Sequence, residues 1–121
     1  YYDKYIRVKY NQLKDSSKNT KYDDSKEYED LDLLLSIVKD LKLNIKFAIL
    51  PAHGKWSDYT GINSEKRQVA YNKLKEIAKK NNIEVMDYSS KEYEDYYMYD
   101  AMHLGWRGWI DFERDLYKLK K

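Results

Sequence analysis

The sequence predicts an α/β fold in which two parallel strands are flanked by three helices. Two short apolar runs, at residues 45–50 and 83–87, have the length and composition of buried strands. Between them, residues 64–81 carry apolar side chains at helical spacing. A strand, a helix and a second strand at this spacing form a right-handed βαβ unit with parallel strands. Similar amphipathic patterns at 25–42 and 106–119 predict the two outer helices.

The N-terminal part of the chain predicts two helices separated by a polar loop. Residues 1–14 place aromatic and apolar side chains three and four apart, which is typical of a short amphipathic helix. Residues 15–24 are polar and without a period, and Ser25 is the expected N-cap of the next helix. We expect that helix to bury Leu31, Leu34, Leu35, Val38 and Leu41.

The central part of the chain is organised around the two strands. Pro51, the only proline, ends the first strand, and residues 51–63 are expected to form a loop rich in glycine and aromatic residues. Asn63 or Ser64 caps the helix that follows, and residues 88–105 form a loop or a broken helix. We expect the two later helices to bury Val69, Ala70, Leu74, Ile77, Ala78, Trp109, Ile110, Leu116 and Leu119.

Composition narrows the class of protein. Ile, Leu, Val and Phe make up only 26 of the 121 residues, so the core is expected to be thin, as in a piece of a larger protein. The 23 basic and 21 acidic residues are interspersed, which argues against a nucleic-acid partner. Cysteine is absent, which excludes disulfides, Cys-zinc sites and a thiol nucleophile. No run approaches the roughly 20 apolar residues of a membrane span, so any anchor is expected outside this chain.

The two strands also predict an incomplete domain. Parallel sheets need both faces covered and usually contain more than two strands. We therefore expect residues 1–121 to be the C-terminal part of a single α/β domain whose other strands lie upstream of Tyr1.

The most informative motif is Asp100-Ala101-Met102-His103. In a Ser-His-Asp triad the imidazole takes the proton of the nucleophile, while a carboxylate on its other nitrogen fixes the tautomer and stabilises the imidazolium. Asp100 is close enough to bond Nδ1 of His103, and Gly105 and Gly108 permit tight backbone approach beside it. These residues predict the acid and the base of an acyl-transfer enzyme. The alternative is a surface histidine whose neighbour Asp100 caps the C-terminal helix.

The nucleophile that such a triad requires has no candidate in this sequence. None of the serines lies in a G-x-S-x-G or G-D-S motif. Ser25 and Ser64 are placed as helix caps, and Ser89 and Ser90 follow the second strand without the glycine that an exposed elbow needs. We therefore expect the nucleophile-bearing N-terminal part to be absent, and this chain alone to be inactive.

A second candidate region directly follows the first strand. His53, Lys55, Trp56 and Tyr59 lie there, and ligands bind at this edge of open α/β sheets. Lys55 suits an anionic group, and the two aromatic rings suit stacking on a sugar or polyol. The alternative is a solvated loop held by one buried Trp. The histidine spacing fits no metal-binding motif and no nucleotide-binding glycine motif occurs, so we expect no metal and no cofactor.

Three stretches resemble the C-terminal portion of the DltD family, the D-alanine transfer proteins of D-alanyl-lipoteichoic acid biosynthesis in Gram-positive bacteria. They are residues 25–31, which open the Leu-rich helix, residues 54–62 (Gly-Lys-Trp-Ser-Asp-Tyr-Thr-Gly-Ile), and residues 98–109 (Met-Tyr-Asp-Ala-Met-His-Leu-Gly-Trp-Arg-Gly-Trp). The last two are long and rich in rare residue types. The resemblance covers nearly the whole chain.

This resemblance implies both a fold and a function. The fold is an SGNH/GDSL-hydrolase-like three-layer α/β domain at the outer face of the cell membrane, with an N-terminal anchor and the nucleophilic serine in the absent portion. By position, Asp100 and His103 are the acid and the base of its triad. The implied activity is transfer of D-alanyl esters from a donor to lipoteichoic acid, together with the other proteins of the D-alanylation pathway.

Two alternatives stay open. The chain can be a non-catalytic binding module for anionic cell-wall polymer or a partner protein, using Trp56, Tyr59 and the aromatic run 93–99. It can also be a small structural α/β domain. One observation separates the enzyme from both, namely whether the Asp100 carboxylate bonds Nδ1 of His103 while Nε2 faces an open cleft.

Overall fold

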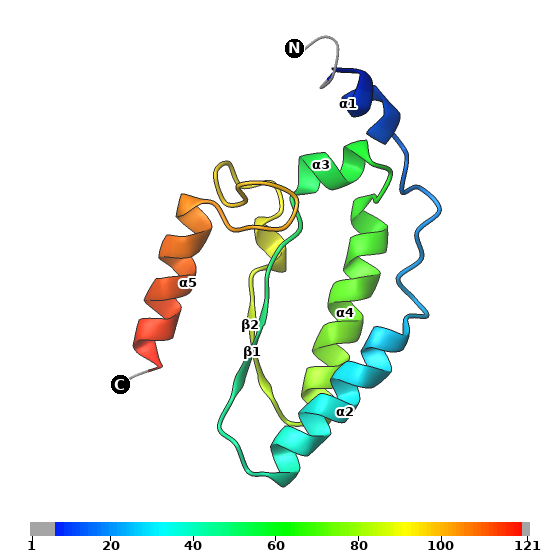
Figure 1. Cartoon of the computed structure of the whole chain (residues 1–121). Coiled ribbons are helices and arrows are strands. Elements are labelled where there is room, and N and C mark those ends of the chain that lie inside the picture. Colours follow the sequence, from blue (N-terminus) through cyan, green and yellow to red (C-terminus); the bar gives the residue numbers. More distant parts are fainter. Residues whose placement is uncertain (1–6, 120–121) are drawn as a thin grey trace.

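The computed structural model describes residues 7–119 and shows a mixed α/β arrangement built on two parallel strands (Figure 1). Strand β1 (Lys46–Ile49) pairs in parallel with β2 (Glu84–Asp87). Helix α4 (Ser64–Lys80) connects the two strands and packs against both. The predicted strand–helix–strand unit with parallel strands is therefore confirmed.

Two further helices flank the strand pair on opposite sides (Figure 1). Helix α2 (Lys26–Asp40) lies along α4, on the side of the strands that α4 covers. Helix α5 (Trp106–Lys118) lies on the other side. The three helices expected from apolar periodicity are confirmed, with ends that differ from the predicted ones by no more than a fraction of a turn.

The helix starts follow the capping preferences of the sequence in part. Asn63 caps α4, because its side-chain oxygen accepts the backbone N–H of Lys66 at 3.1 Å. Ser25 is the N-cap residue of α2, but its side chain makes no capping hydrogen bond. Helix α1 (Val8–Leu13) is the described part of the helix expected over residues 1–14, of which residues 1–6 lie outside the described range.

The segment predicted as a loop over residues 51–63 contains a helix. Helix α3 (Gly54–Tyr59) starts directly after His53. It is too short for apolar periodicity to reveal, and its cap is a histidine rather than one of the usual capping residues. The long connection over 88–105 is irregular as expected, apart from one 3₁₀ turn, η2 (Ser89–Lys91).

Several side chains that were predicted to be buried are exposed. Of the five expected on α2, only Leu35 is buried, while Leu34 and Leu41 are 56% and 64% exposed. On α5, Trp109 and Ile110 are about half exposed. Val69, Leu116 and Leu119 are the other exposed members of the predicted set. Periodicity identifies the apolar face of a helix, but burial needs a neighbouring element, and residues 7–119 supply none over these faces.

The main buried cluster lies at the carboxyl end of the strands, between them and α5. It consists of Tyr88, Tyr97, Met98 and Leu104, with Met86 and Phe112 packed against it. The four buried residues Tyr88, Tyr97, Met98 and Leu104 all belong to the irregular connection after β2. That connection is therefore fixed by packing, although it has little regular secondary structure.

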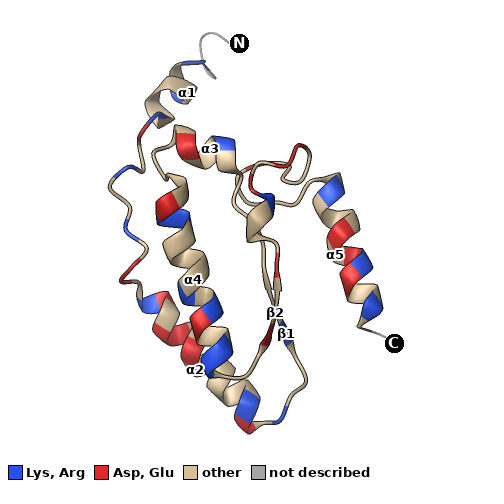
Figure 2. Cartoon of the chain, turned by 180° about the vertical axis from the view of Figure 1, so that it is seen from behind, with Lys and Arg blue, Asp and Glu red and all other residues tan. Residues whose placement is uncertain are grey.

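The helices carry charges of both signs. Basic and acidic residues are intermingled along α2, α4 and α5 (Figure 2). Within residues 7–119, the helices lack the length and the apolar character needed to cross a bilayer.

Candidate active site

His103 ends a tight turn whose two arms are anchored in the core. The backbone N–H of Tyr99 donates to the carbonyl of His103 at 2.8 Å, and Met98 forms an antiparallel bridge with Leu104. Met98 and Leu104 are both buried. Residues 100–102 therefore form the exposed tip of a loop that is held firmly at its base.

Two glycines allow α5 to begin directly after this turn. A Cβ atom on Gly105 would lie 2.2 Å from the carbonyl oxygen of Tyr96, and one on Gly108 would lie 2.5 Å from that of Tyr97. No other residue fits at such distances, so the predicted tight backbone approach is confirmed. The residue at the N-cap of α5 is Gly105, and not Asp100, so the alternative in which Asp100 caps the C-terminal helix is wrong on that point.

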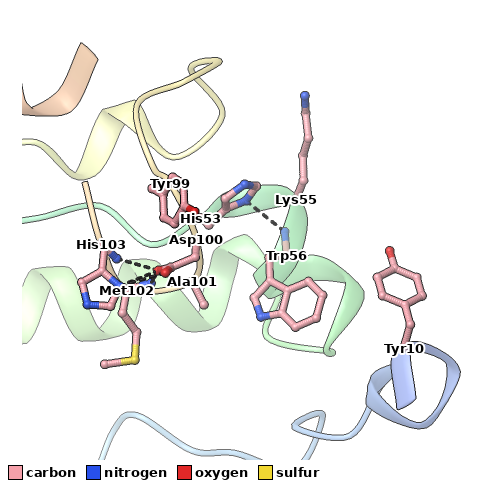
Figure 3. Close-up of a pocket in the computed structure, with 9 residues that line it drawn as sticks. All are labelled: Tyr10, His53, Lys55, Trp56, Tyr99, Asp100, Ala101, Met102 and His103. Carbon is pink, nitrogen blue, oxygen red and sulfur yellow. Dashed lines mark hydrogen bonds and ion pairs between the residues drawn. The ribbon is translucent and has the colours of Figure 1, made fainter. Parts of the chain in front are cut away.

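The Asp100 carboxylate bonds the imidazole of His103 (Figure 3). Its two oxygens lie 2.9 and 2.8 Å from Nδ1, and Oδ1 also accepts the backbone N–H groups of Met102 and His103 at 2.8 and 2.9 Å. An ionised carboxylate only accepts hydrogen bonds, so a neutral His103 ring carries its proton on Nδ1. Nε2 then keeps its lone pair on a side chain that is 72% exposed.

These donors keep Asp100 ionised. The backbone N–H of Met102, followed by the ring and the backbone N–H of His103, lowers the pKa of Asp100 from 3.8 to about 2. The carboxylate is therefore negative at any physiological pH. It is placed to stabilise a positive charge on the adjacent ring.

His53 lies between the end of β1 and the start of α3. Its Nδ1 accepts the backbone N–H of Trp56 at 3.3 Å, so a neutral His53 ring carries its proton on Nε2. The side chain thus serves as the cap of α3 and retains one free donor. The two histidines of the sequence are held as opposite tautomers by their neighbours.

The turns that carry the two histidines border one open cleft of about 560 Å³ (Figure 3). We call it the His53–His103 cleft. It is lined by Tyr10, His53, Lys55, Trp56, Tyr99, Asp100, Ala101, Met102 and His103. Five of the six residues selected from the sequence therefore meet in one place, on the connections that follow the carboxyl ends of β1 and β2.

Tyr59 is the selected residue that the structure places outside this lining. Its ring stacks on that of Tyr10, with centroids 4.3 Å apart, and its hydroxyl donates to the carbonyl of Tyr10 at 2.8 Å. Both rings also contact Trp56, with centroid distances of 6.0 Å. Tyr59 therefore supports the aromatic wall of the cleft from behind, and α1 contributes to that wall through Tyr10.

Lys55 is the cation of the cleft, and its partner is weakly held. Nζ lies 3.1 Å from Oδ1 of Asp95, and both side chains are largely exposed. Exposed ion pairs of this kind contribute about 0.2–1 kcal/mol. The ammonium group can therefore turn to an incoming anion at little cost.

A buried polar group behind the cleft was missed by the sequence analysis. Arg67 is 4% exposed, and its guanidinium binds the carboxylate of Glu92 with both Nε and Nη2, at 2.7 and 2.9 Å. Tyr71, also on α4, donates its hydroxyl to Glu92 at 2.7 Å. The signal was present in the sequence, because Arg67 and Tyr71 are one turn apart on the inward face that continues to Ala78.

The cleft contains an imidazole bonded to a carboxylate, but no side chain suited to be a nucleophile. None of its nine lining residues carries a hydroxyl on an aliphatic side chain or a thiol. Within residues 7–119, no three His, Cys, Asp or Glu side chains form a group that can hold a metal ion. The arrangement can accept a proton at Nε2 of His103 and stabilise the resulting charge, provided that a hydroxyl from elsewhere reaches it.

Comparison with known proteins identifies the relatives of this chain. The family model described as DltD protein matches residues 1–121. Protein DltD of Bacillus subtilis (strain 168) is 35% identical over 121 residues, which cover 98% of this chain and 31% of the relative. Protein DltD of Staphylococcus aureus (strain NCTC 8325 / PS 47) is 33% identical over 97 residues, covering 80% and 25%. Protein DltD of Lacticaseibacillus rhamnosus is 31% identical over 115 residues, covering 94% and 27%. The chain thus spans less than a third of the length of these curated relatives.

Proposed function

This chain belongs to the DltD family, and we propose that it forms the base-carrying part of an acyltransferase or esterase that helps to transfer D-alanyl esters to lipoteichoic acid. Asp100 is the orienting acid, and His103 is the general base. The nucleophilic serine and the oxyanion hole come from sequence outside these 121 residues, within one domain of the SGNH/GDSL-hydrolase-like three-layer type. The full-length protein acts at the outer face of the cell membrane, with the other proteins of the D-alanylation pathway.

One observation carries this proposal. The Asp100 carboxylate bonds Nδ1 of His103 at 2.8 Å, while the ring borders an open cleft with Nε2 unpartnered among the described residues. Here one nitrogen is oriented by a carboxylate and the other is left accessible, as a general base requires.

The chemistry follows from the tautomer. Nε2 of His103 takes the proton of the serine as its oxygen attacks the carbonyl carbon of the D-alanyl ester, and Asp100 stabilises the imidazolium. The same proton passes to the oxygen of the leaving alcohol when the ester bond breaks. In the second half, Nε2 takes the proton of an acceptor hydroxyl as its oxygen attacks the acyl-serine, and returns that proton to the serine oxygen when the acyl–serine bond breaks. Each step moves one proton through one nitrogen, so the residues present account for the acid–base part of the reaction.

The opposite side of the cleft suits the acceptor. A glycerol- or ribitol-phosphate chain is an anionic polyol, and Lys55 offers an ammonium group that is only weakly paired. Trp56 presents a ring that Tyr59 and Tyr10 hold in place. The free Nε2–H of His53 adds a donor. We assign these residues to substrate binding, with Tyr59 acting through Trp56.

The test is hydrolysis of a D-alanyl ester of a glycerol-phosphate oligomer by the full-length protein and by its His103→Ala variant. Removal of the base is expected to lower kcat by about 10⁴-fold or more. Glu113→Ala is the matched control, because Glu113 is exposed on α5 away from the cleft lining. Full activity of His103→Ala, with Glu113→Ala also active, would refute the assignment of the base.

A non-catalytic binding module remains the second candidate, favoured by the aromatic and cationic wall of the cleft. It predicts that Trp56→Ala weakens binding of a glycerol-phosphate oligomer while His103→Ala leaves both binding and turnover unchanged. Isothermal titration of the two variants separates the candidates. If neither variant changes binding or turnover, the chain is a structural α/β domain.

A further inference from the structure

We propose that Tyr71 and Glu92 are positioning residues that fix the backbone around His53, and thereby hold one wall of the His53–His103 cleft at a set distance from the other. Neither residue lines this cleft. The kinetic part of the proposal rests on the function proposed above, whereas its structural part stands on the contacts alone.

The backbone on both sides of His53 is held from behind. The N–H of Ala52 donates to the hydroxyl oxygen of Tyr71 at 2.8 Å. The N–H of Gly54 donates to the backbone carbonyl of Glu92 at 2.8 Å. These two bonds fix the peptide groups that flank His53, so the direction of its side chain and the start of α3 depend on them.

Tyr71 and Glu92 act as one unit. The Tyr71 hydroxyl has a single proton, which it donates to Oε1 of Glu92 at 2.7 Å, so its oxygen is free to accept the N–H of Ala52. Both residues are 6% exposed. The two hydrogen bonds therefore run in one direction, from the N–H of Ala52 through the Tyr71 hydroxyl to Glu92. Water could replace them only by entering the core.

Arg67 completes the unit by connecting it to α3. Its Nε and Nη2 bind the two oxygens of Glu92, and its Nη1 binds Oδ1 of Asp58 at 2.7 Å. Asp58 also accepts the hydroxyl of Tyr93 at 2.6 Å. The connection that carries His53, Lys55 and Trp56 is therefore held at its start through Ala52 and near its end through Asp58.

The same unit is joined to the catalytic side of the cleft. Glu92 belongs to the irregular connection that continues, through the buried residues Tyr97 and Met98, to the turn carrying Asp100 and His103. One segment thus supplies both the turn of the proposed base and the clamp on the opposite wall. Any shift of Glu92 relative to Ala52 and Gly54 changes the separation of the two walls, which is why we assign a positioning role rather than a general contribution to packing.

Tyr71→Phe in the full-length protein is the decisive variant, because it deletes the bridging oxygen and keeps the ring. Tyr88→Phe is the matched control. Tyr88 is also buried, and its hydroxyl also donates to a carboxylate, Oδ2 of Asp115 at 3.0 Å, but it accepts no N–H from the turn around His53. Two substrates are compared: 4-nitrophenyl acetate, which is too small to span the cleft, and a D-alanyl ester of a glycerol-phosphate oligomer.

We expect Tyr71→Phe to raise KM for the oligomer ester about tenfold, the equivalent of one lost hydrogen bond, with kcat on both substrates within about twofold of wild type. We also expect backbone amide exchange in residues 50–56 to be about tenfold faster, measured by mass spectrometry. Tyr88→Phe should change neither quantity.

Unchanged exchange in residues 50–56, or a parallel loss of kcat on both substrates, overturns the positioning role. A wild-type protein without ester turnover overturns the proposed function instead. The exchange measurement then still decides whether Tyr71 holds the turn, so the two failures are distinguishable.

Discussion

The carboxylate of Asp100 does two things for His103. It bonds the ring at Nδ1, and through Oδ1 it accepts the backbone N–H of the same residue at 2.9 Å. Local side-chain-to-backbone bonds of this kind shape a turn. Asp100 therefore sets both the position of the His103 backbone and the tautomer of its ring, and a useful variant must separate the two roles.

Asp100→Asn separates them. The amide oxygen can still accept the backbone N–H groups of Met102 and His103, so the turn is expected to persist. The amide cannot stabilise an imidazolium by charge, and kcat for ester hydrolysis by the full-length protein should fall by about 10⁴-fold. Asp100→Ala should lose the turn as well, seen as faster amide exchange in residues 99–104. Equal activity of the Asn variant and wild type contradicts the triad assignment.

The two histidines are expected to be opposite tautomers when neutral. The carboxylate keeps the proton of His103 on Nδ1, whereas the bond from the Trp56 N–H requires an unprotonated Nδ1 on His53. Long-range ¹H–¹⁵N spectra of the full-length protein, recorded with both rings neutral, distinguish the two states. His103→Ala and His53→Ala assign the signals. A dominant Nε2–H tautomer at His103 would show that the carboxylate does not orient the ring.

Asp100 should titrate near pH 2, and its pairing should be stable to acid. Its folded pKa is lowered below 3.8, so the stability that it contributes is fully present above the unfolded value and is lost as the pH falls through about 2. The ¹³Cγ shift of Asp100 in a labelled full-length protein reports this midpoint, with exposed Asp residues as internal references. A midpoint near 3.8 would mean that the Met102 and His103 donors do not hold the carboxylate in solution.

Local patterns of the fold and the site were predictable from the sequence, whereas the burial of helix faces and the short helix α3 were not. Strand–helix–strand spacing and the Asp100/His103 motif are local patterns, and both are found where they were expected. Periodicity could not tell that Leu34 and Trp109 are exposed, because exposure depends on what covers a helix face and not on the helix itself. Helix α3 was not predicted because its six residues are too few to show an apolar periodicity, and because its N-cap is a histidine rather than a usual capping residue.

The buried unit behind the cleft was the least predictable part. Arg67 and Glu92 are distant in sequence, and nothing in the pattern of α4 identifies the partner of a buried guanidinium. A charged residue such as Arg67 on the inward face of a helix does indicate that it has a partner of opposite charge, because an unpaired buried charge is very costly. Which residue that partner is depends on the tertiary structure and cannot be read from the sequence pattern.

Gly105→Ala should strongly destabilise the folded protein, and Gly54→Ala should do so less. The new methyl group at Gly105 meets a backbone carbonyl of Tyr96, which cannot move without displacing the buried turn. At Gly54 the nearest atoms, at 2.6 Å and beyond, belong to the ring of Tyr93, a half-exposed side chain that can shift at the cost of its hydroxyl bonds to Asp58 and Arg67. We expect losses of about 3 kcal/mol and about 1 kcal/mol in urea unfolding of the full-length protein. The reverse order would contradict the close approach at Gly105.

Removing one partner of the ion pair between Arg67 and Glu92 should destabilise the fold more than removing both partners. Arg67→Met leaves a buried carboxylate with only the Tyr71 hydroxyl, and we expect a loss of about 3–5 kcal/mol in the free energy of unfolding. In Arg67→Met/Glu92→Leu neither charge remains to be desolvated, so the double variant should be more stable than Arg67→Met alone. A double-mutant cycle by urea unfolding measures the coupling energy of the two residues. The exposed pair Lys55 and Asp95 is the reference and is expected to give at most about 1 kcal/mol.

The same double variant also separates stability from function. Because it loses the acceptor of the Tyr71 hydroxyl, it should recover stability without recovering the KM for the oligomer ester. Recovery of both would mean that the unit only stabilises the domain, whereas recovery of stability alone places its function at the wall of the cleft.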